Sequence, residues 1–353
     1  MKKIIICLLL PLFLLGCSKK SREETRQAAT QPSAALPFKI AVVEETPEIK
    51  EQNEIENQAV ILLKTKDYDK LDDLAAKYRS NKECYADCSQ KLALVYDGIE
   101  PKEEALNTTW EARLQEIRDW IEAKPQSVTA RIAMARCMVS YAWKARSSDY
   151  ASKVSDESWQ SFFKRLNEAV DILNEAKNLK DPCPAYWSTL MMASLGLQVT
   201  KPQFNDIFQQ AIKAEPDYKY YYHTRAVFLL PRWYGDEGEW EKDLARSADN
   251  IGGTEGDMVY AQVVWGIHHY GSSIDVFEGN KISWDRVDRG FEVILKQFPD
   301  SLAAKNERAH LAALAGDKAK AREYFIKTQG RVDLSMWSEK SEYVACANWA
   351  FEQ

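Results

Sequence analysis

The chain has 353 residues and a formal net charge of −6, from 47 Lys and Arg against 53 Asp and Glu. An acidic balance lacks the basic surface that nucleic-acid-binding proteins need, so we expect no nucleic-acid partner. Glycine and proline are sparse, at 14 and 12 residues, which favours helices over turn-rich β structure.

The first residues have the pattern of a bacterial export signal. Lys2 and Lys3 precede an apolar stretch at residues 4–15, which is shorter than the roughly 20 residues needed to span a bilayer. It ends in Leu14-Leu15-Gly16-Cys17, which resembles the lipobox of bacterial lipoproteins. This resemblance implies a signal peptide at residues 1–16, cleavage before Cys17, a diacylglycerol on its thiol and a further acyl chain such as palmitate. Two or more acyl chains anchor a protein stably to a membrane.

The residues after Cys17 bear on location. In Gram-negative lipoproteins an aspartate in the second position favours the inner membrane, and Ser18 stands there instead. For a Gram-negative cell, the resemblance therefore favours the periplasmic side of the outer membrane over the inner membrane. Residues 17–46 are mostly polar, which predicts a flexible tether after the lipidated cysteine. Within it, residues 38–43 could form a short extended segment.

Five cysteines remain once Cys7 and Cys17 are assigned to the signal and the lipid. They are Cys84, Cys88, Cys137, Cys183 and Cys346. An odd number in an oxidising compartment requires at least one thiol. Cys84 and Cys88 would share one face of a helix, and we leave open either a strained disulfide between them or two thiols.

From residue 47 onward the chain reads as paired helices. Thr46 followed by Pro47 indicates a helix start. Apolar residues then recur at the 3.6-residue spacing of amphipathic helices. Four of these stripes are Ile55, Ala59, Leu62 and Leu63; Trp110, Leu114, Ile117, Trp120 and Ile121; Val128, Ile132, Ala135, Val139 and Ala142; and Phe162, Leu166, Ala169, Leu173 and Ala176. Short turns between the helices predict antiparallel hairpins, and hence an all-α fold over residues 47–353.

The last hairpins resemble the tetratricopeptide repeat. That repeat places small residues where its two helices touch, and an aromatic residue four positions after one of them. Ala309, the turn Gly316-Asp317, Ala321 and Phe325 fit this pattern, within residues 284–353. The prolines that would end successive repeats are not spaced by multiples of about 34 residues. The resemblance therefore implies an irregular, tetratricopeptide-like solenoid.

Two short motifs resemble the DUF4034 family, a group of bacterial helical proteins with no assigned activity. The first contains Trp120, Pro125, Ser127, Ala130, Ala133-Met134-Ala135 and the run from Tyr141 to Arg146; the second runs from Leu230 to Trp240. The resemblance covers residues 105–270 and implies a helical architecture. It implies no mechanism.

The second motif is also the best candidate for partner binding. Pro231 ends an aromatic helix, Gly235 and Gly238 permit a reversal, and Asp236 or Glu237 can cap the next helix. One interpretation is a packed corner between hairpins, with the tryptophans in the core. The other is a groove for an envelope protein or peptide, because aromatic residues with arginine are typical of interface hot spots. The groove would be lined by Arg232, Trp233, Tyr234, Asp236 and Trp240.

The sequence contains no recognised catalytic or metal-binding motif. His268 and His269 are adjacent, so on a helix they point about 100° apart and cannot hold one metal ion from a single face. We expect one packed and one solvated histidine, no metal ligands, no cofactor and no catalytic residues. The sequence therefore predicts a membrane-anchored interaction scaffold. The alternative is an envelope-acting enzyme, a hydrolase with an unrecognised site.

Overall fold

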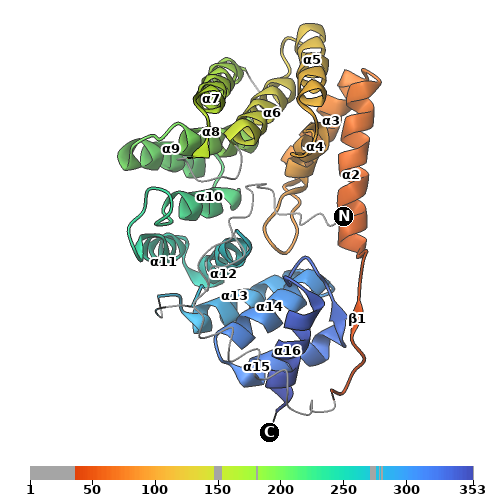
Figure 1. Ribbon diagram of the computed structural model, residues 1–353, viewed down its shortest axis with the longest axis vertical. Helices are drawn as coiled ribbons and strands as arrows, with labels where there is room; N and C mark the ends of the chain where they lie inside the picture. The colour runs from red at the N-terminus through yellow and green to blue at the C-terminus, as the bar shows by residue number, and fades with distance from the viewer. Residues whose placement is uncertain are drawn as a thin grey trace. The chain divides into compact units, whose positions relative to one another are not determined.

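A computed structural model describes residues 36–146, 153–179, 182–270, 276–277, 279 and 281–352. Within these residues fifteen α-helices and one pair of two-residue strands occur, so the fold is all-α and repeat-like, as predicted (Figure 1). None of the helices described is both long and apolar enough to cross a bilayer. The signal peptide, Cys17 and most of the expected tether lie outside the described residues.

The described chain divides into two compact units. The N-terminal unit comprises residues 49–236, and the C-terminal unit comprises residues 36–48 and 237–352. The first unit holds α2 (Pro47–Lys64), α3 (Tyr68–Asn81), α4 (Lys91–Ile99), α5 (Asn107–Ala123), α6 (Val128–Arg146), α7 (Asp156–Lys177), α8 (Pro184–Gly196), α9 (Lys201–Ala214) and α10 (Tyr220–Phe228). Only the first two residues of α2 fall in the other unit.

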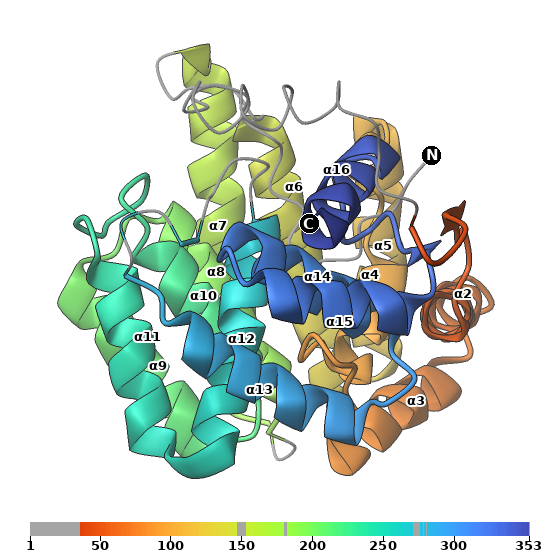
Figure 2. The same cartoon turned by 90° about the horizontal axis from the view of Figure 1, so that it is seen from below.

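The C-terminal unit contains six helices and both strands. They are β1 (Ala41–Val42), α11 (Glu239–Ile251), α12 (Gly253–His269), α13 (Trp284–Gln297), α14 (Leu302–Leu314), α15 (Lys318–Thr328), β2 (Arg331–Val332) and α16 (Lys340–Phe351). Successive helices pack against each other, α12 on α13 and α14 on α15 above all. Figure 2 shows α14 and α15 side by side.

The four predicted apolar stripes contribute to the core of the N-terminal unit, and the predicted hairpin residues of α14 and α15 contribute to the core of the C-terminal unit. Every residue of the stripe on α6 is buried, as is every residue of the stripe on α7. In α14 and α15, Ala309, Ala321 and Phe325 are fully buried between the paired helices. Burial of apolar side chains at about 25 cal/mol per Å² is the main force that holds such hairpins together.

Polar side chains define where several helices begin. Ser155, Ser283 and Ser301 each accept a hydrogen bond from the backbone N–H three residues later, at the start of α7, α13 and α14. Thr200 and Gln203 form a reciprocal capping box at the start of α9. These bonds satisfy backbone donors that have no partner within the helix.

The end of the expected tether is bound to the C-terminal unit. β1 pairs in parallel with β2, with Ala41 opposite Arg331 and Val42 opposite Val332. The ring of Phe38 also contacts Phe351 of α16 edge to face, at 5.8 Å between centroids. Gly330 permits this approach, because a Cβ there would lie 2.3 Å from the carbonyl oxygen of Lys39. Residues 38–43 are therefore an extended segment of the fold, inside the boundary predicted for the tether.

Candidate functional site

The predicted corner after α10 is a packed turn of the N-terminal unit. The Tyr234 hydroxyl donates a hydrogen bond to the carbonyl oxygen of Leu195 at 2.8 Å, and its ring lies 4.7 Å from that of Phe228. Trp233 packs edge to face on Trp143, at 5.7 Å between ring centroids. Both aromatic side chains are half-buried, so their inner faces complete the core and their outer edges reach the surface.

The charged residues of this corner are exposed, whereas Trp240 is not. Arg232 and Asp236 lie on the surface, and Asp236 forms an ion pair with Lys201 at 3.2 Å. Trp240 is 5% exposed and belongs to α11 of the C-terminal unit. The prediction that Trp240 lines a groove is therefore wrong: it is a core residue, because it begins the apolar face of α11. The residue that precedes α11 as its N-cap is Gly238, with φ at 79°, and not Asp236 or Glu237.

Cys84 and Cys88 are thiols and are not joined by a disulfide. They also do not lie on one helix. Both fall in the turn between α3 and α4, where Cys84 pairs with Gln90 as an isolated bridge and Cys88 has a left-handed φ of 68°. Burial raises the pKa of the Cys88 thiol well above its usual value. The same holds for Cys137 in α6.

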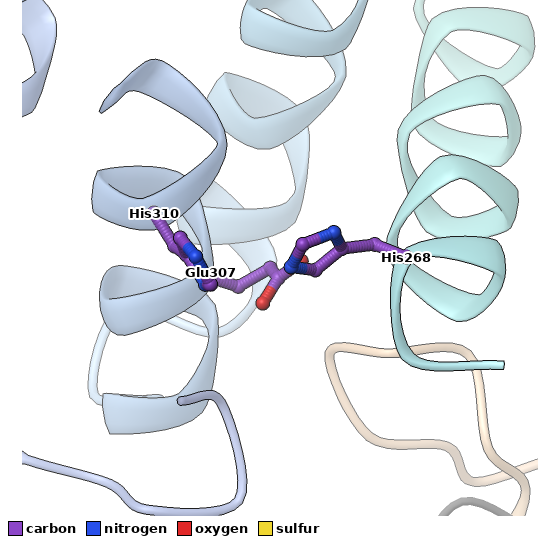
Figure 3. Close-up of side chains that lie close together, drawn as sticks. All are labelled: His268, Glu307 and His310. Atoms are coloured by element: carbon purple, nitrogen blue, oxygen red, sulfur yellow. The ribbon is translucent and has the colours of Figure 1, made fainter. Parts of the chain in front are cut away.

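A cluster of histidine and glutamate side chains lies between helices of the C-terminal unit. His268 comes from the last turn of α12, and Glu307 and His310 lie one turn apart on α14. Each offers one potential ligand atom, and the three atoms lie within 4.8 Å of one another. Figure 3 shows the Glu307 side chain reaching from α14 toward the imidazole of His268. We call these three residues the His–Glu cluster.

Neighbouring groups hold the His–Glu cluster in place. His269 Nε2 lies 2.6 Å from Glu307 Oε2. His310 Nδ1 lies 3.1 Å from the carbonyl oxygen of Met336, and because a carbonyl only accepts, Nδ1 carries the proton. The ring of Trp337 stacks on His310 at 4.1 Å, and its Nε1–H donates to Asn306 Oδ1 at 2.9 Å. Glu307 and His310 are therefore each held by a partner outside the cluster.

Glu342 of α16 approaches the cluster from another side. Its Oε1 lies 3.5 Å from His310 Nε2, and its Oε2 accepts a hydrogen bond from the backbone N–H of Ser338 at 2.8 Å. Burial raises the pKa of Glu342, but the hydrogen bond and the charge of His310, together with Ser338, outweigh it and lower that pKa to about 2. Glu342 is thus a carboxylate at neutral pH.

Sequence reasoning missed this cluster. The expectation of one packed and one solvated histidine is wrong, because His268 and His269 are both half-buried, and His269 is only 12% exposed. The two rings also do not diverge as predicted: their centroids lie 4.9 Å apart, and both side chains reach Glu307 of α14. The local signal was the i, i+3 spacing of Glu307 and His310, which places a carboxylate and an imidazole on one helix face. Histidine nitrogens and a carboxylate are the ligands that zinc and related divalent ions prefer.

The fold and these sites define an all-α protein of paired helices, with a buried polar cluster in its C-terminal unit. Residues 57–205 match the family model described as Domain of unknown function (DUF4034). The match includes the first motif, around Trp120 to Arg146, and lies within the N-terminal unit. It starts and ends earlier than the predicted residues 105–270, and the second motif, Leu230 to Trp240, lies outside it. No curated protein matches the chain.

Proposed function

We propose that this chain is a lipid-anchored, extracytoplasmic interaction scaffold of the bacterial envelope. The observation that carries the proposal is the sequence Leu14-Leu15-Gly16-Cys17 after an apolar stretch of signal-peptide length, which directs lipid to Cys17. Ser18 favours the periplasmic side of the outer membrane over the inner membrane. Paired helices suit the scaffold role, because stacked hairpins offer extended surfaces for other chains.

The hairpin of α14 and α15 supports a tetratricopeptide-like character. Ala309 and Ala321 are fully buried where the two helices meet, and Phe325 packs four residues after Ala321. Gly316 has a φ of 78° in the connecting turn, and Asp317 caps α15 by accepting from the N–H of Lys320. These are the positions at which the repeat places small, aromatic and turn residues.

The surface proposed for the partner is the corner at Arg232 to Asp236. It presents an exposed guanidinium and an exposed carboxylate beside the outer edges of Trp233 and Tyr234. Arginine with aromatic residues on a rigid turn is a combination typical of binding hot spots. Tyr234 is held by its hydrogen bond to Leu195, so the corner loses little side-chain entropy when it binds. An envelope protein or peptide is the partner that this chemistry fits.

In living cells, a photo-crosslinking amino acid at position 232 or 236 tests this surface. We expect a discrete adduct with an envelope protein. The matched control is position 122, because Glu122 of α5 is also exposed and lies on the same unit. The surface is refuted if positions 232 and 236 capture nothing, or capture only what position 122 captures.

A second candidate is the envelope-acting hydrolase, and the convergence of His268, Glu307 and His310 favours it. The two candidate functions predict different results when variants are expressed in a strain that lacks the native gene. A scaffold that acts through the corner loses function in Arg232→Ala and keeps it in Glu307→Gln. A hydrolase that acts through the cluster behaves in the opposite way. Complementation of the deletion phenotype by each variant decides between them.

A further inference from the structure

We propose that His268, Glu307 and His310 form a binding site for a divalent transition-metal ion, of the kind that zinc occupies. Two imidazoles and one carboxylate are the protein ligands of one common class of zinc site, which leaves a further coordination position open. The proposal concerns the C-terminal unit alone and is independent of the scaffold function.

The spacing of the ligand atoms is close to that of a loaded site. The three atoms lie within 4.8 Å of one another. Zinc sits about 2.0–2.1 Å from nitrogen and oxygen ligands, so tetrahedral ligand atoms are roughly 3.3 Å apart. The widest pair therefore has to close by at most about 1.5 Å. Small rotations of His268 and Glu307 about their side-chain bonds supply this movement without any shift of α12 or α14.

The charge of the cluster also calls for a cation. Glu307 is fully buried, and within the described part of the chain its Oε1 has no hydrogen-bond partner. A buried carboxylate with an unsatisfied oxygen destabilises the fold, because only its one remaining hydrogen bond offsets the free energy lost when the group leaves water. Of the two carboxylate oxygens, it is Oε2 that His269 contacts. A metal ion bound by Oε1 would satisfy the second oxygen and neutralise the buried charge.

The outer contacts are those that metal-binding histidines use. A ligating imidazole commonly donates its other N–H to a carbonyl or a carboxylate, which fixes the ring and its tautomer. His310 Nδ1–H donates to the carbonyl oxygen of Met336, so Nε2 is the nitrogen with a lone pair for the metal. On Glu307, the contact of His269 with Oε2 orients the carboxylate in the same way.

Glu342 marks the position of a fourth ligand. Its Oε1 is 3.5 Å from His310 Nε2, the nitrogen assigned to the metal. A metal ion bound by that nitrogen would lie within reach of Glu342, which would either complete the coordination or accept a hydrogen bond from a bound water. The site then combines residues of α12, α14 and α16.

Zinc titration of the full chain tests the proposal. The chain is expressed in bacteria, purified in mild detergent, stripped with a chelator and titrated with Zn²⁺ by calorimetry, with the bound metal counted by mass spectrometry. We expect one zinc ion per chain. Glu307→Gln and His268→Gln should each weaken binding by more than about 100-fold, and His269→Gln, which removes only an outer contact, by about 10- to 100-fold.

Two matched variants serve as controls. His223→Gln removes the remaining histidine, which lies in the N-terminal unit, and Glu292→Gln removes a largely exposed glutamate of α13. Both should bind zinc as the unmodified chain does. Cobalt(II) gives a readout that needs no variant, because a four-coordinate site produces intense visible absorption that octahedral aqueous cobalt lacks.

The proposal fails if the unmodified chain binds no zinc. It also fails if zinc binds with equal affinity to Glu307→Gln and His268→Gln variants that keep the helical circular-dichroism spectrum. If those variants do not fold, cobalt in the unmodified chain decides. A spectrum that stays octahedral overturns the site, and a four-coordinate spectrum that zinc displaces supports it.

Discussion

Asp257 of α12 holds two arginines of α13 at once. Its Oδ1 accepts from Arg286 Nε and its Oδ2 from Arg289 Nε, each at 2.8 Å. Burial raises the pKa of Asp257, but the hydrogen bonds and charges of the two arginines outweigh it and lower that pKa below its usual value of 3.8. The carboxylate therefore connects α12 to α13 while it is ionised.

Asp257→Asn should lower the free energy of unfolding by about 1–2 kcal/mol at pH 7, because two charge-assisted hydrogen bonds are lost and Arg289 is well solvated. A carboxyl whose folded-state pKa is depressed stabilises the fold above its unfolded-state pKa. That stabilisation is lost as the pH falls through the folded-state pKa. The difference between the two proteins should therefore shrink below pH 3.8.

Urea denaturation at neutral and acid pH measures this difference. Asp300→Asn is the control, because Asp300 is exposed in the turn between α13 and α14. It should change stability little at any pH. A destabilisation by Asp257→Asn that is equally large in acid would mean that the carboxylate charge is not the cause.

At the scale of elements, close helix contacts depend on a few glycines. Gly290 of α13 lies against α12, where a Cβ would come within 2.2 Å of the carbonyl oxygen of Asp257 and 2.5 Å of the Cβ of Ala261. Helix propensity alone predicts that Gly290→Ala stabilises α13 by about 1 kcal/mol. The clash is with backbone, which cannot rotate aside, and overpacking costs about 1–3 kcal/mol.

We therefore expect Gly290→Ala to lower the free energy of unfolding by up to about 2 kcal/mol, since the steric cost of about 1–3 kcal/mol exceeds the propensity gain of about 1 kcal/mol. Thermal and urea denaturation measure the sign directly. Lys296→Ala, at an exposed position on the same helix, controls for alanine in α13 and should be nearly neutral. A stabilised Gly290→Ala variant would show that α12 and α13 are not in such close contact.

The helices that sequence predicted best are those with one polar face. Four of the five residues in the predicted stripe of α5 are buried and Ile121 is half-buried; the four are Trp110, Leu114, Ile117 and Trp120. The sequence of α12 shows no such amphipathic pattern. Its residues 258–265 are all buried, so polar residues do not recur on one face at the helical spacing. The pairing of β1 with β2 was also inaccessible, since two residues carry no periodicity and their partner lies almost the whole chain away.

At the scale of the whole molecule, the corner at Arg232 to Asp236 and the His–Glu cluster differ in how close their residues are in the sequence. The corner at Arg232 to Asp236 was predicted because its proline, glycines and aromatics are consecutive in the sequence. Trp240 was misassigned to it, because proximity along the chain does not decide which core a side chain enters. His268 meets Glu307 only because α12 and α14 both pack on α13, and no local pattern encodes that contact. Only the spacing of Glu307 and His310, which places them on one face of α14, could have been recognised in the sequence.

In the proposed function, attachment to a membrane depends on one atom, the sulfur of Cys17. Each buried CH₂ of an acyl chain contributes about 0.8 kcal/mol, so two or more chains hold a protein stably whereas a single chain does not. Cys17→Ala removes the thiol proposed to accept the diacylglycerol. We therefore expect this variant to carry no lipid and to appear in the soluble fraction, with an unchanged helical spectrum.

Metabolic labelling with a fatty acid, followed by membrane fractionation, measures both effects. Cys7→Ala is the matched control, because it removes a cysteine from the apolar stretch and leaves Leu14-Leu15-Gly16-Cys17 intact. It should be acylated normally. Ser18→Asp should keep the lipid and move the protein toward the inner membrane in a Gram-negative host. Normal acylation of Cys17→Ala would refute the anchor, because no other residue of the motif can form the thioether to the lipid.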